Sequence, residues 1–412
     1  MDKAIDRRWY VLVLATATTM LVMAMPNMSL PVLFREISLD LDLDLVRIGS
    51  IWGFGALARA VFGLFGGALG DLRKTKWVVG CACIASGLVG GARGLSNGYA
   101  VLVVTTLLGG VVGSAIPMNV HKTVSQWFSS KSLGKANSLL ALGVGLGAAV
   151  GSLVSASLLS PWLGGWRHVV FFYGGMSIVV GLLWLLSPDP PRQENPKAGE
   201  RVWKDLGLGF RAVLPLKAFW VVSLGALLFG AAMHGLTGYL PLYLRGNGWT
   251  SLSADSALSA YHAASIIGVI PLVVLAERLR AMRGLLLCGA FTLAAGLLLI
   301  GAFPGALVWP VVVIMGLFRE AVVATAITQT VRLAGVGPRL AGTALGLSFS
   351  LSGIGRFLSP PLGNSLARFG DGYPFLLWAF LAVASLVTFL FMKRLKKVVP
   401  GEVVSGVSDA PW

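Results

Sequence analysis

Long apolar runs, each about as long as a membrane is thick, constrain this chain more than any other feature. A helix needs about 20 apolar residues to cross the hydrocarbon core of a bilayer, and the sequence contains twelve such runs between charged or proline-rich breaks. Only 12% of the residues are charged, against roughly 25% in an ordinary soluble protein. We therefore expect an all-α membrane protein with twelve transmembrane helices.

The longest polar interval separates the sixth run from the seventh and begins Ser187-Pro188-Asp189-Pro190-Pro191. It predicts two six-helix bundles, 1–187 and 218–394, joined by a cytoplasmic linker, 188–217, and followed by a cytoplasmic tail, 395–412. Within the linker, 202–213 is expected to form a short amphipathic helix on the membrane surface. The expected spans are 9–33, 48–70, 77–95, 99–120, 135–159, 168–186, 218–244, 258–276, 285–303, 306–331, 340–362 and 373–392.

Basic residues are distributed unevenly between the two sides of the membrane. If the N-terminus is cytoplasmic, 24 of the 33 Lys and Arg residues fall on the cytoplasmic side and 6 on the other side. Cytoplasmic loops are enriched in Lys and Arg, so we expect both termini in the cytoplasm and the protein in the cell membrane. The excess of 33 basic over 17 acidic residues is then a topology signal, and no nucleic-acid partner is expected.

The second half of the chain weakly repeats the first. A shift of 206 residues places Asp71, at the end of the second span, on Glu277, at the end of the eighth. Such matches at equivalent points of the topology favour a parallel duplication about an axis normal to the membrane, although glycine-rich helices also align by chance. A shift of 208 superimposes Gly134, Ala136, Gly145 and Gly147 on Gly342, Ala344, Gly353 and Gly355.

The loop after the second span reads Gly67-Ala68-Leu69-Gly70-Asp71-Leu72-Arg73-Lys74-Thr75-Lys76. Together with twelve spans and a basic central linker, it resembles the cytoplasmic signature of the major facilitator superfamily of secondary transporters, although Leu72 stands where Arg is usual and Lys74 where Gly is usual. The resemblance implies two helical bundles that rock about a central site. We expect Asp71 and Arg73 to form a cytoplasmic gate, as the resemblance also implies, with Glu277 at the equivalent position.

A second, less specific resemblance concerns the fourth to sixth spans. Gln126-Trp127-Phe128, Gly134-Lys135-Ala136, Gly143-Val144-Gly145-Leu146-Gly147 and Gly165-Trp166-Arg167 are similar to segments of the anion and monocarboxylate branches of that superfamily.

Few ionisable side chains fall inside the expected spans. Each costs about 2.5–3.5 kcal/mol on insertion scales, so it is expected to face a cavity or a partner. Arg59 lies in the second span, and Ser348, Ser352 and Arg356 recur every four residues in the eleventh, which gives one polar stripe on a helix. A guanidinium beside hydroxyls suits a carboxylate or an oxyanion. We therefore predict substrate contacts from Arg59, Ser352 and Arg356.

The tenth span contains Arg319 next to Glu320. Neighbours on a helix point about 100° apart, so we expect each side chain to have a partner elsewhere. Glu320 is the one acidic residue deep in a span, where burial favours its protonated form, and it is a candidate proton carrier. His234 is a second candidate, because histidine titrates near physiological pH.

Three further residues are expected at the substrate site or near it. Arg319, His262 and Asn27 are the candidates, from the tenth, eighth and first spans. Other interpretations remain open: Arg59 or Arg356 could form a salt bridge between helices, for example with Glu320, and His262 and His234 could be hydrogen-bonded packing residues.

The four charges deep inside the spans, those of Arg59, Arg319, Arg356 and Glu320, sum to +2. This favours a small anionic solute, such as a monocarboxylate or an inorganic oxyanion, moved with protons. Two alternatives remain: proton-coupled export of cationic or apolar compounds, and a membrane sensor or scaffold without transport. Against export, spans one and four lack a buried acid, and the fifth span lacks the proline of the exporter signature.

The remaining expectations concern partners and chemistry. We expect a monomer in the lipid bilayer, without cofactor, metal or enzymatic activity, because the sequence contains no nucleotide-binding loop, zinc motif or catalytic triad. The third, sixth, ninth and twelfth spans have no ionisable residue in their middles and are expected to face lipid. The cysteines Cys81, Cys83 and Cys288 are expected to be inert buried thiols.

Overall fold

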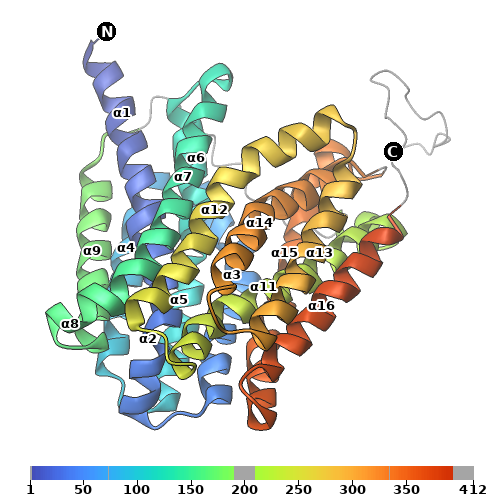
Figure 1. Cartoon of the computed structure of the whole chain (residues 1–412). Helices are drawn as coiled ribbons and strands as arrows, with labels where there is room; N and C mark the ends of the chain where they lie inside the picture. Colours follow the sequence, from blue (N-terminus) through green and yellow to red (C-terminus); the bar gives the residue numbers. More distant parts are fainter. Residues whose placement is uncertain (1, 73, 190–208, 334, 393–412) are drawn as a thin grey trace.

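The structure is a computed structural model that describes residues 2–72, 74–189, 209–333 and 335–392. Within these ranges all regular structure is helical and there is no β-strand, which confirms the expected all-helical fold. Long helices stand side by side, and the N-terminus lies at the top of the view (Figure 1).

The described residues of the first half form six helical rods, two of which are single helices and four of which are made of shorter pieces. The pieces of one rod follow one another without a loop, and two of the junctions are π-helical. In chain order the elements are α1 (Asp2–Ala17), η1 (Thr18–Ala24), α2 (Met25–Leu41), α3 (Leu45–Leu72), α4 (Thr75–Ala92), η2 (Arg93–Leu95), α5 (Tyr99–Gly113), α6 (Ala115–Trp127), α7 (Ser130–Val154), η3 (Ser155–Leu159), α8 (Ser160–Leu163) and α9 (Trp166–Leu186).

The second half consists mainly of long unbroken helices. They are α11 (Lys217–Gly246), α12 (Ser251–Arg278), α13 (Met282–Ala302), α14 (Val308–Val331), α15 (Gly337–Ser365), η5 (Leu366–Phe369) and α16 (Tyr373–Leu390).

Eleven of the described helical stretches are long and apolar enough to cross a membrane. The predicted eleventh span corresponds to α15, which is not among them, because its serines and Arg356 make it more polar than its neighbours. The count of twelve spans therefore stays a prediction. Several helices continue past the predicted ends: α12 covers Ser251–Arg278 instead of 258–276, because backbone hydrogen bonding extends beyond the apolar stretch.

Two predicted segments lie wholly or partly outside the described residues. They are the tail 395–412 and most of the amphipathic stretch 202–213, of which only 209–213 is described, and it is helical.

The expectation that all three cysteines are buried is wrong. Cys83 is buried, but Cys81 on α4 and Cys288 on α13 are exposed on the protein surface. Both helices belong to the predicted lipid-facing set, and each also exposes large apolar side chains, such as Leu88 and Phe291. An apolar run cannot distinguish a core position from a lipid-facing one, since both are apolar.

Helices from the two halves meet most closely along α3 and α15. A Cβ atom on Gly53 would lie 2.3 Å from the carbonyl oxygen of Phe357, and one on Gly353 would lie 2.0 Å from Cβ of Ala60. The glycines therefore allow near-contact of the two backbones. Near the end of the interface, the Asn364 amide donates to the Leu45 carbonyl oxygen at 2.7 Å.

These contacts identify which side of the bundle is closed. We call the side where α9 ends and α11 begins the linker side, which the sequence predicts to be cytoplasmic. The first residues of α3 and the last of α15 lie on the opposite side, and the described α3–α15 contacts run from there to mid-bundle. The two halves also meet at a second interface, between α7 and α12. There the Ser259 hydroxyl of α12 donates to the Ala149 carbonyl oxygen of α7 at 2.8 Å. The two halves are thus joined through the opposite side and the middle.

Replacing Gly53 by Ala is expected to force α3 and α15 apart, because the added methyl group would overlap the Phe357 backbone. Overpacking of this kind costs about 1–3 kcal/mol. The melting temperature of the purified protein in detergent should fall. Gly63→Ala on the same helix is the matched control, since a Cβ there meets no atom within 4 Å; equal melting temperatures for the two variants would contradict the assigned contact.

Candidate functional site

The ionisable residues of the spans gather in one region near the middle of the bundle. His234 on α11 interacts electrostatically with Arg59, Arg319 and Arg356, and Arg356 interacts with Arg319 and Glu320. The charges come from α3 in the first half of the chain and from the consecutive helices α14 and α15 in the second half. The structure therefore brings together three arginines and one carboxylate, the set that the sequence singled out.

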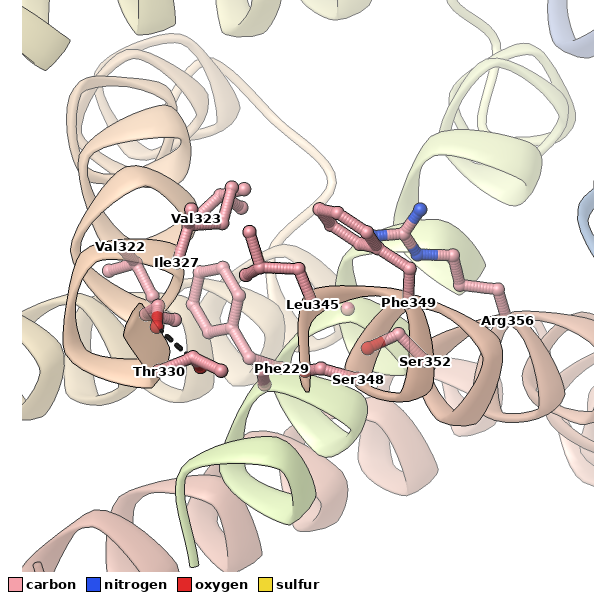
Figure 2. A pocket seen from close by; sticks show the side chains of 13 residues that line it. Phe229, Val322, Val323, Ile327, Thr330, Leu345, Ser348, Phe349, Ser352 and Arg356 are labelled. Carbon is pink, nitrogen blue, oxygen red and sulfur yellow. Dashed lines mark hydrogen bonds between the residues drawn. The ribbon is translucent and has the colours of Figure 1, made fainter. Parts of the chain in front are cut away.

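The polar stripe of α15 lines a pocket between α11, α14 and α15. Figure 2 shows Ser348, Ser352 and Arg356 along one helix, with Phe229 and Val323 among the other lining residues. The two hydroxyl groups make no hydrogen bond within the described residues, although Ser348 is only 8% exposed and Ser352 5%. Unpartnered buried polar groups that face a pocket are typical of a binding site.

Arg356 is the charged residue of this pocket, and its guanidinium lies against α11. A Cβ atom on Gly230 would be 3.3 Å from Nε of Arg356, so the glycine makes room for the side chain. Nε of Arg356 is buried without a hydrogen bond, and Arg356 forms no ion pair in the described part of the chain. The alternative of a salt bridge between Arg356 and Glu320 is not realised here.

Arg59 is exposed in the middle of α3. Its guanidinium lies close to Gly55, about one turn earlier on α3: a Cβ atom on Gly55 would be 3.5 Å from Nη1 of Arg59 and would also contact Thr106 of α5. It has neither a hydrogen bond nor an ion pair among the described residues, and it interacts electrostatically with Arg356. Two guanidiniums that repel each other and have no ion pair among the described residues are a candidate site for an anion.

The expectation that Arg319 and Glu320 do not pair with each other is wrong, although Arg319 does have the expected partners on another helix. Nη2 of Arg319 lies 3.1 Å from Oε1 of Glu320, because the long arginine side chain bends round the helix to its neighbour. Arg319 also reaches α12, where Nη1 lies 3.0 Å from Nδ1 of His262 and 3.4 Å from Oγ of Ser265. Its guanidinium sits 5.6 Å from the ring centre of Tyr261.

These contacts define the state of His262. Arginine can only donate a hydrogen bond, so Nδ1 accepts, and the imidazole is neutral with its proton on Nε2. Nε2 is buried without a partner. His262 therefore holds Arg319 in position, which favours the packing interpretation over proton transfer.

His234 lies at the junction of the two halves. Its ring stacks on Trp52 of α3 with centres 4.5 Å apart and an angle of 10° between the planes. The Trp52 indole donates to the His234 carbonyl oxygen at 3.0 Å. A protonated His234 would add a fourth positive charge beside three arginines, so a structural role at the junction suits it better than proton transport.

The other predicted residues are not brought into this region by any described contact. Asn27 on α2 is half-buried and forms no hydrogen bond within the described residues. The side chains of Asp71 and Arg73, the expected gate, lie outside the described residues. Glu277 forms an exposed ion pair with Arg332, 3.5 Å apart, at the linker-side ends of α12 and α14.

Residues 74–76 of the loop after the second expected span lie within the described residues. Lys76 and Lys74 bind Asp189 at the start of the linker, at 2.9 and 3.3 Å. The hydrogen bond from Lys76 is the main reason that the pKa of Asp189 lies below its usual value, and the Lys74 bond acts in the same direction. The basic residues of the loop thus tether the linker.

One polar contact that sequence reasoning missed joins the halves on the opposite side. Arg245 of α11 donates to the Val32 carbonyl oxygen of α2 and pairs with Asp255 of α12. Both side chains are buried, at 3% and 0% exposure. Arg245 and Asp255 fall between the expected spans 218–244 and 258–276. Their spacing of ten, across a short turn between two spans, was the available signal.

Arg93 falls near the end of the expected span 77–95, among the six basic residues assigned to the non-cytoplasmic side. It begins η2, but its Nη2 would be 2.6 Å from a Cβ atom on Gly109 of α5, and it interacts electrostatically with Arg59. Its side chain therefore lies against a transmembrane helix.

Two arginines without an ion pair among the described residues, Arg356 in a pocket at mid-bundle and Arg59 on the neighbouring α3, give this helical membrane protein a candidate site for a solute. A family model described as Major Facilitator Superfamily matches residues 12–360. The chain belongs to this superfamily of transporters.

Similar proteins agree with this assignment. The 3-(3-hydroxy-phenyl)propionate transporter of Escherichia coli (strain K12) is 25% identical over 87% of this chain and 88% of its own length. The probable galactarate/D-glucarate transporter GudP of the same organism is 26% identical over 47% of this chain and 44% of its own length. A bacterial homologue of the human lysosomal transporter Spinster, solved in an inward-facing, occupied conformation, has a TM-score of 0.79 at 16% identity and covers 94% of this chain and 97% of its own.

Removing one partner of the buried Arg245–Asp255 pair should destabilise the protein. Asp255→Leu leaves a buried guanidinium unpaired, at a cost of about 3–5 kcal/mol, and should lower the melting temperature in detergent. The double variant Arg245→Met with Asp255→Leu removes both charges and should recover most of the loss. A single variant as stable as the parent protein would show that the pair does not hold the opposite side together.

Proposed function

We propose that this chain is a secondary active transporter of a small organic or inorganic anion, driven by the proton gradient. It works by alternating access between two six-helix halves, 1–187 and 218–394, joined by the linker 188–217, with α15 as one of twelve spans. It acts as a monomer in the cell membrane with both termini in the cytoplasm.

One observation supports the anion above all others: Arg59 and Arg356, on the two helices that join the halves, repel each other electrostatically, and neither forms an ion pair among the described residues. The hydroxyls of Ser348 and Ser352 add unpartnered donors beside Arg356. The substrates named for the relatives point the same way, since 3-(3-hydroxy-phenyl)propionate, galactarate and D-glucarate are carboxylates.

The charges of the site also explain why the movement of the two halves depends on binding of the anion. Arg59 and Arg356 repel each other across the junction of α3 and α15. The repulsion is strong in a low dielectric. An anion between the guanidiniums replaces repulsion with two attractions, and the halves can then close around it from the linker side while the contacts of the opposite side separate.

Glu320 provides the coupling to protons. As a carboxylate it neutralises Arg319 and attracts Arg356. When it is protonated, the region gains one positive charge and holds an anion more strongly. Proton and anion therefore favour each other's binding, and this gives symport.

Replacing Arg356 by Ala should abolish uptake of a carboxylate into proteoliposomes, since a hydrogen-bonded charge pair contributes about 1.5–3 kcal/mol, or at least about tenfold in binding. Arg59→Ala should act in the same way. Arg356→Lys keeps the charge but loses the planar guanidinium and should be intermediate. Arg368→Ala, in η5 outside the cluster, is the matched control. Unchanged uptake of 3-(3-hydroxyphenyl)propionate and D-glucarate by a folded Arg356→Ala protein would remove the basis of the anion site.

Glu320→Gln should uncouple transport from the proton gradient. The glutamine imitates a permanently protonated carboxyl group, so substrate exchange across the liposome membrane should continue while a pH gradient no longer drives accumulation. The measurement is uptake with and without an imposed pH gradient, beside exchange at equal pH. Accumulation that still follows the gradient would transfer the proton-carrying role to His234 or His262.

A further inference from the structure

We infer that the substrate is an amphiphilic carboxylate: one carboxylate group bound at Arg356, and an aromatic or branched hydrocarbon body without hydroxyl groups in the pocket between α11, α14 and α15. This inference rests on the proposed function as an anion transporter, and it names the substrate class of the same site.

The polar groups of the pocket lie along one line. Ser348, Ser352 and Arg356 succeed one another at successive turns of α15 (Figure 2). None of the three forms a hydrogen bond to another residue in the described ranges, and Nε of Arg356 is buried without a partner. The remaining hydroxyl of the lining, that of Thr330, already donates to the Ala326 carbonyl oxygen at 2.9 Å. The pocket therefore offers one positively charged end, which is sufficient for a single carboxylate.

The other walls are hydrocarbon. The lining residues from α11 and α14 include Phe229, Val322, Val323 and Ile327, and Leu345 and Phe349 of α15 complete the surface. Neither an amide nor a second charged side chain lines this pocket. A bound hydrocarbon body would cover these side chains and remove them from water, which favours binding.

A sugar acid meets the same walls at a disadvantage. Its hydroxyl groups would lose their hydrogen bonds to water and find valine, isoleucine and phenylalanine side chains in return. Each polar group left without a partner lowers affinity by about tenfold or more. The pocket thus discriminates between two carboxylates of equal charge by the polarity of their bodies.

The position of the pocket also orients the substrate. Arg356 lies near the middle of the bundle, whereas Leu345 and Thr330 lie nearer the linker-side ends of α15 and α14. The carboxylate therefore binds at mid-bundle, between the halves, and the hydrocarbon body extends toward the linker side within the C-terminal half. The charged group meets the residues that respond to the proton, and the apolar body determines selectivity.

The test compares three probes on the purified full-length protein in detergent, by calorimetric titration and by the shift in melting temperature. 3-Phenylpropionate combines a carboxylate with an apolar body, D-glucuronate has the same charge and a hydroxylated body, and 3-phenylpropanamide has the apolar body without the charge. We expect 3-phenylpropionate to bind at least about tenfold more tightly than either of the others.

A variant of the apolar wall makes the test specific to this pocket. Val323→Thr keeps the side-chain shape and introduces a hydroxyl group, so it should weaken 3-phenylpropionate binding severalfold and reduce its margin over D-glucuronate. Val313→Thr introduces the same hydroxyl at an exposed position of the same helix and should leave both affinities unchanged.

The outcomes separate this inference from the proposed function. D-Glucuronate binding as tightly as 3-phenylpropionate, with both lost in Arg356→Ala, would overturn the apolar body and keep anion transport. Equal binding of 3-phenylpropanamide and 3-phenylpropionate would overturn the carboxylate, and with it the anion site. Equal effects of Val323→Thr and Val313→Thr would exclude the pocket between α11, α14 and α15 as the position of the body.

Discussion

A guanidinium inside the hydrocarbon layer costs about 2.5–3.5 kcal/mol on insertion scales, and this chain holds Arg59, Arg319 and Arg356 in the middle of its helices. The structure meets the cost in two ways. Arg319 is satisfied from within the protein, by Glu320 and by His262. Arg59 is exposed and Arg356 faces the pocket, and both lack a protein counter-ion. Arg319, which has an ion pair and a hydrogen bond within the protein, is therefore the structural part of the cluster. Arg59 and Arg356, which have no ion pair among the described residues, are the part that can bind a ligand.

The helices with the unsatisfied arginines also join the two halves. On α3, Gly53 lies within two turns of Arg59, and on α15 Gly353 lies three residues before Arg356. The backbone approach that these glycines allow and the stacking of Trp52 on His234 are therefore within a few residues of the anion site. In the proposed mechanism, a change of charge at the site acts directly on the helix pair that separates when the opposite side opens, so no distant pathway is needed to connect binding with movement.

Much of the fold and part of the site could be predicted from the sequence, for physical reasons that differ between residues. Membrane-length apolar runs reveal helices because a helix pairs its own backbone polar groups, which lipid cannot do. Charges in such runs, such as those of Arg59 and Arg356, stand out because lipid solvates them poorly. The Arg319–Glu320 contact was missed because helical geometry fixes the Cα–Cβ direction but not the course of a long side chain. The Arg245–Asp255 pair was missed because hydropathy places it at a span boundary, while its burial depends on how α2, α11 and α12 pack. The same ambiguity hid the exposure of Cys81 and Cys288, since lipid and protein core select the same residue types.

In the proposed mechanism, the position of Glu320 determines the sign of the coupling between proton and anion. A carboxylate paired with Arg356 itself would compete with the substrate for one guanidinium, and a proton would then be needed merely to free the site. Glu320 instead contacts Arg319 on its own helix and acts on Arg356 through the electrostatic field. Its protonation raises the positive potential at the anion site without changing a ligand of that site. Removing a negative charge near a bound anion always strengthens the anion's binding, and by linkage the anion strengthens proton binding by the same factor. A carboxyl group beside the site, and not in it, therefore favours the movement of both species in the same direction.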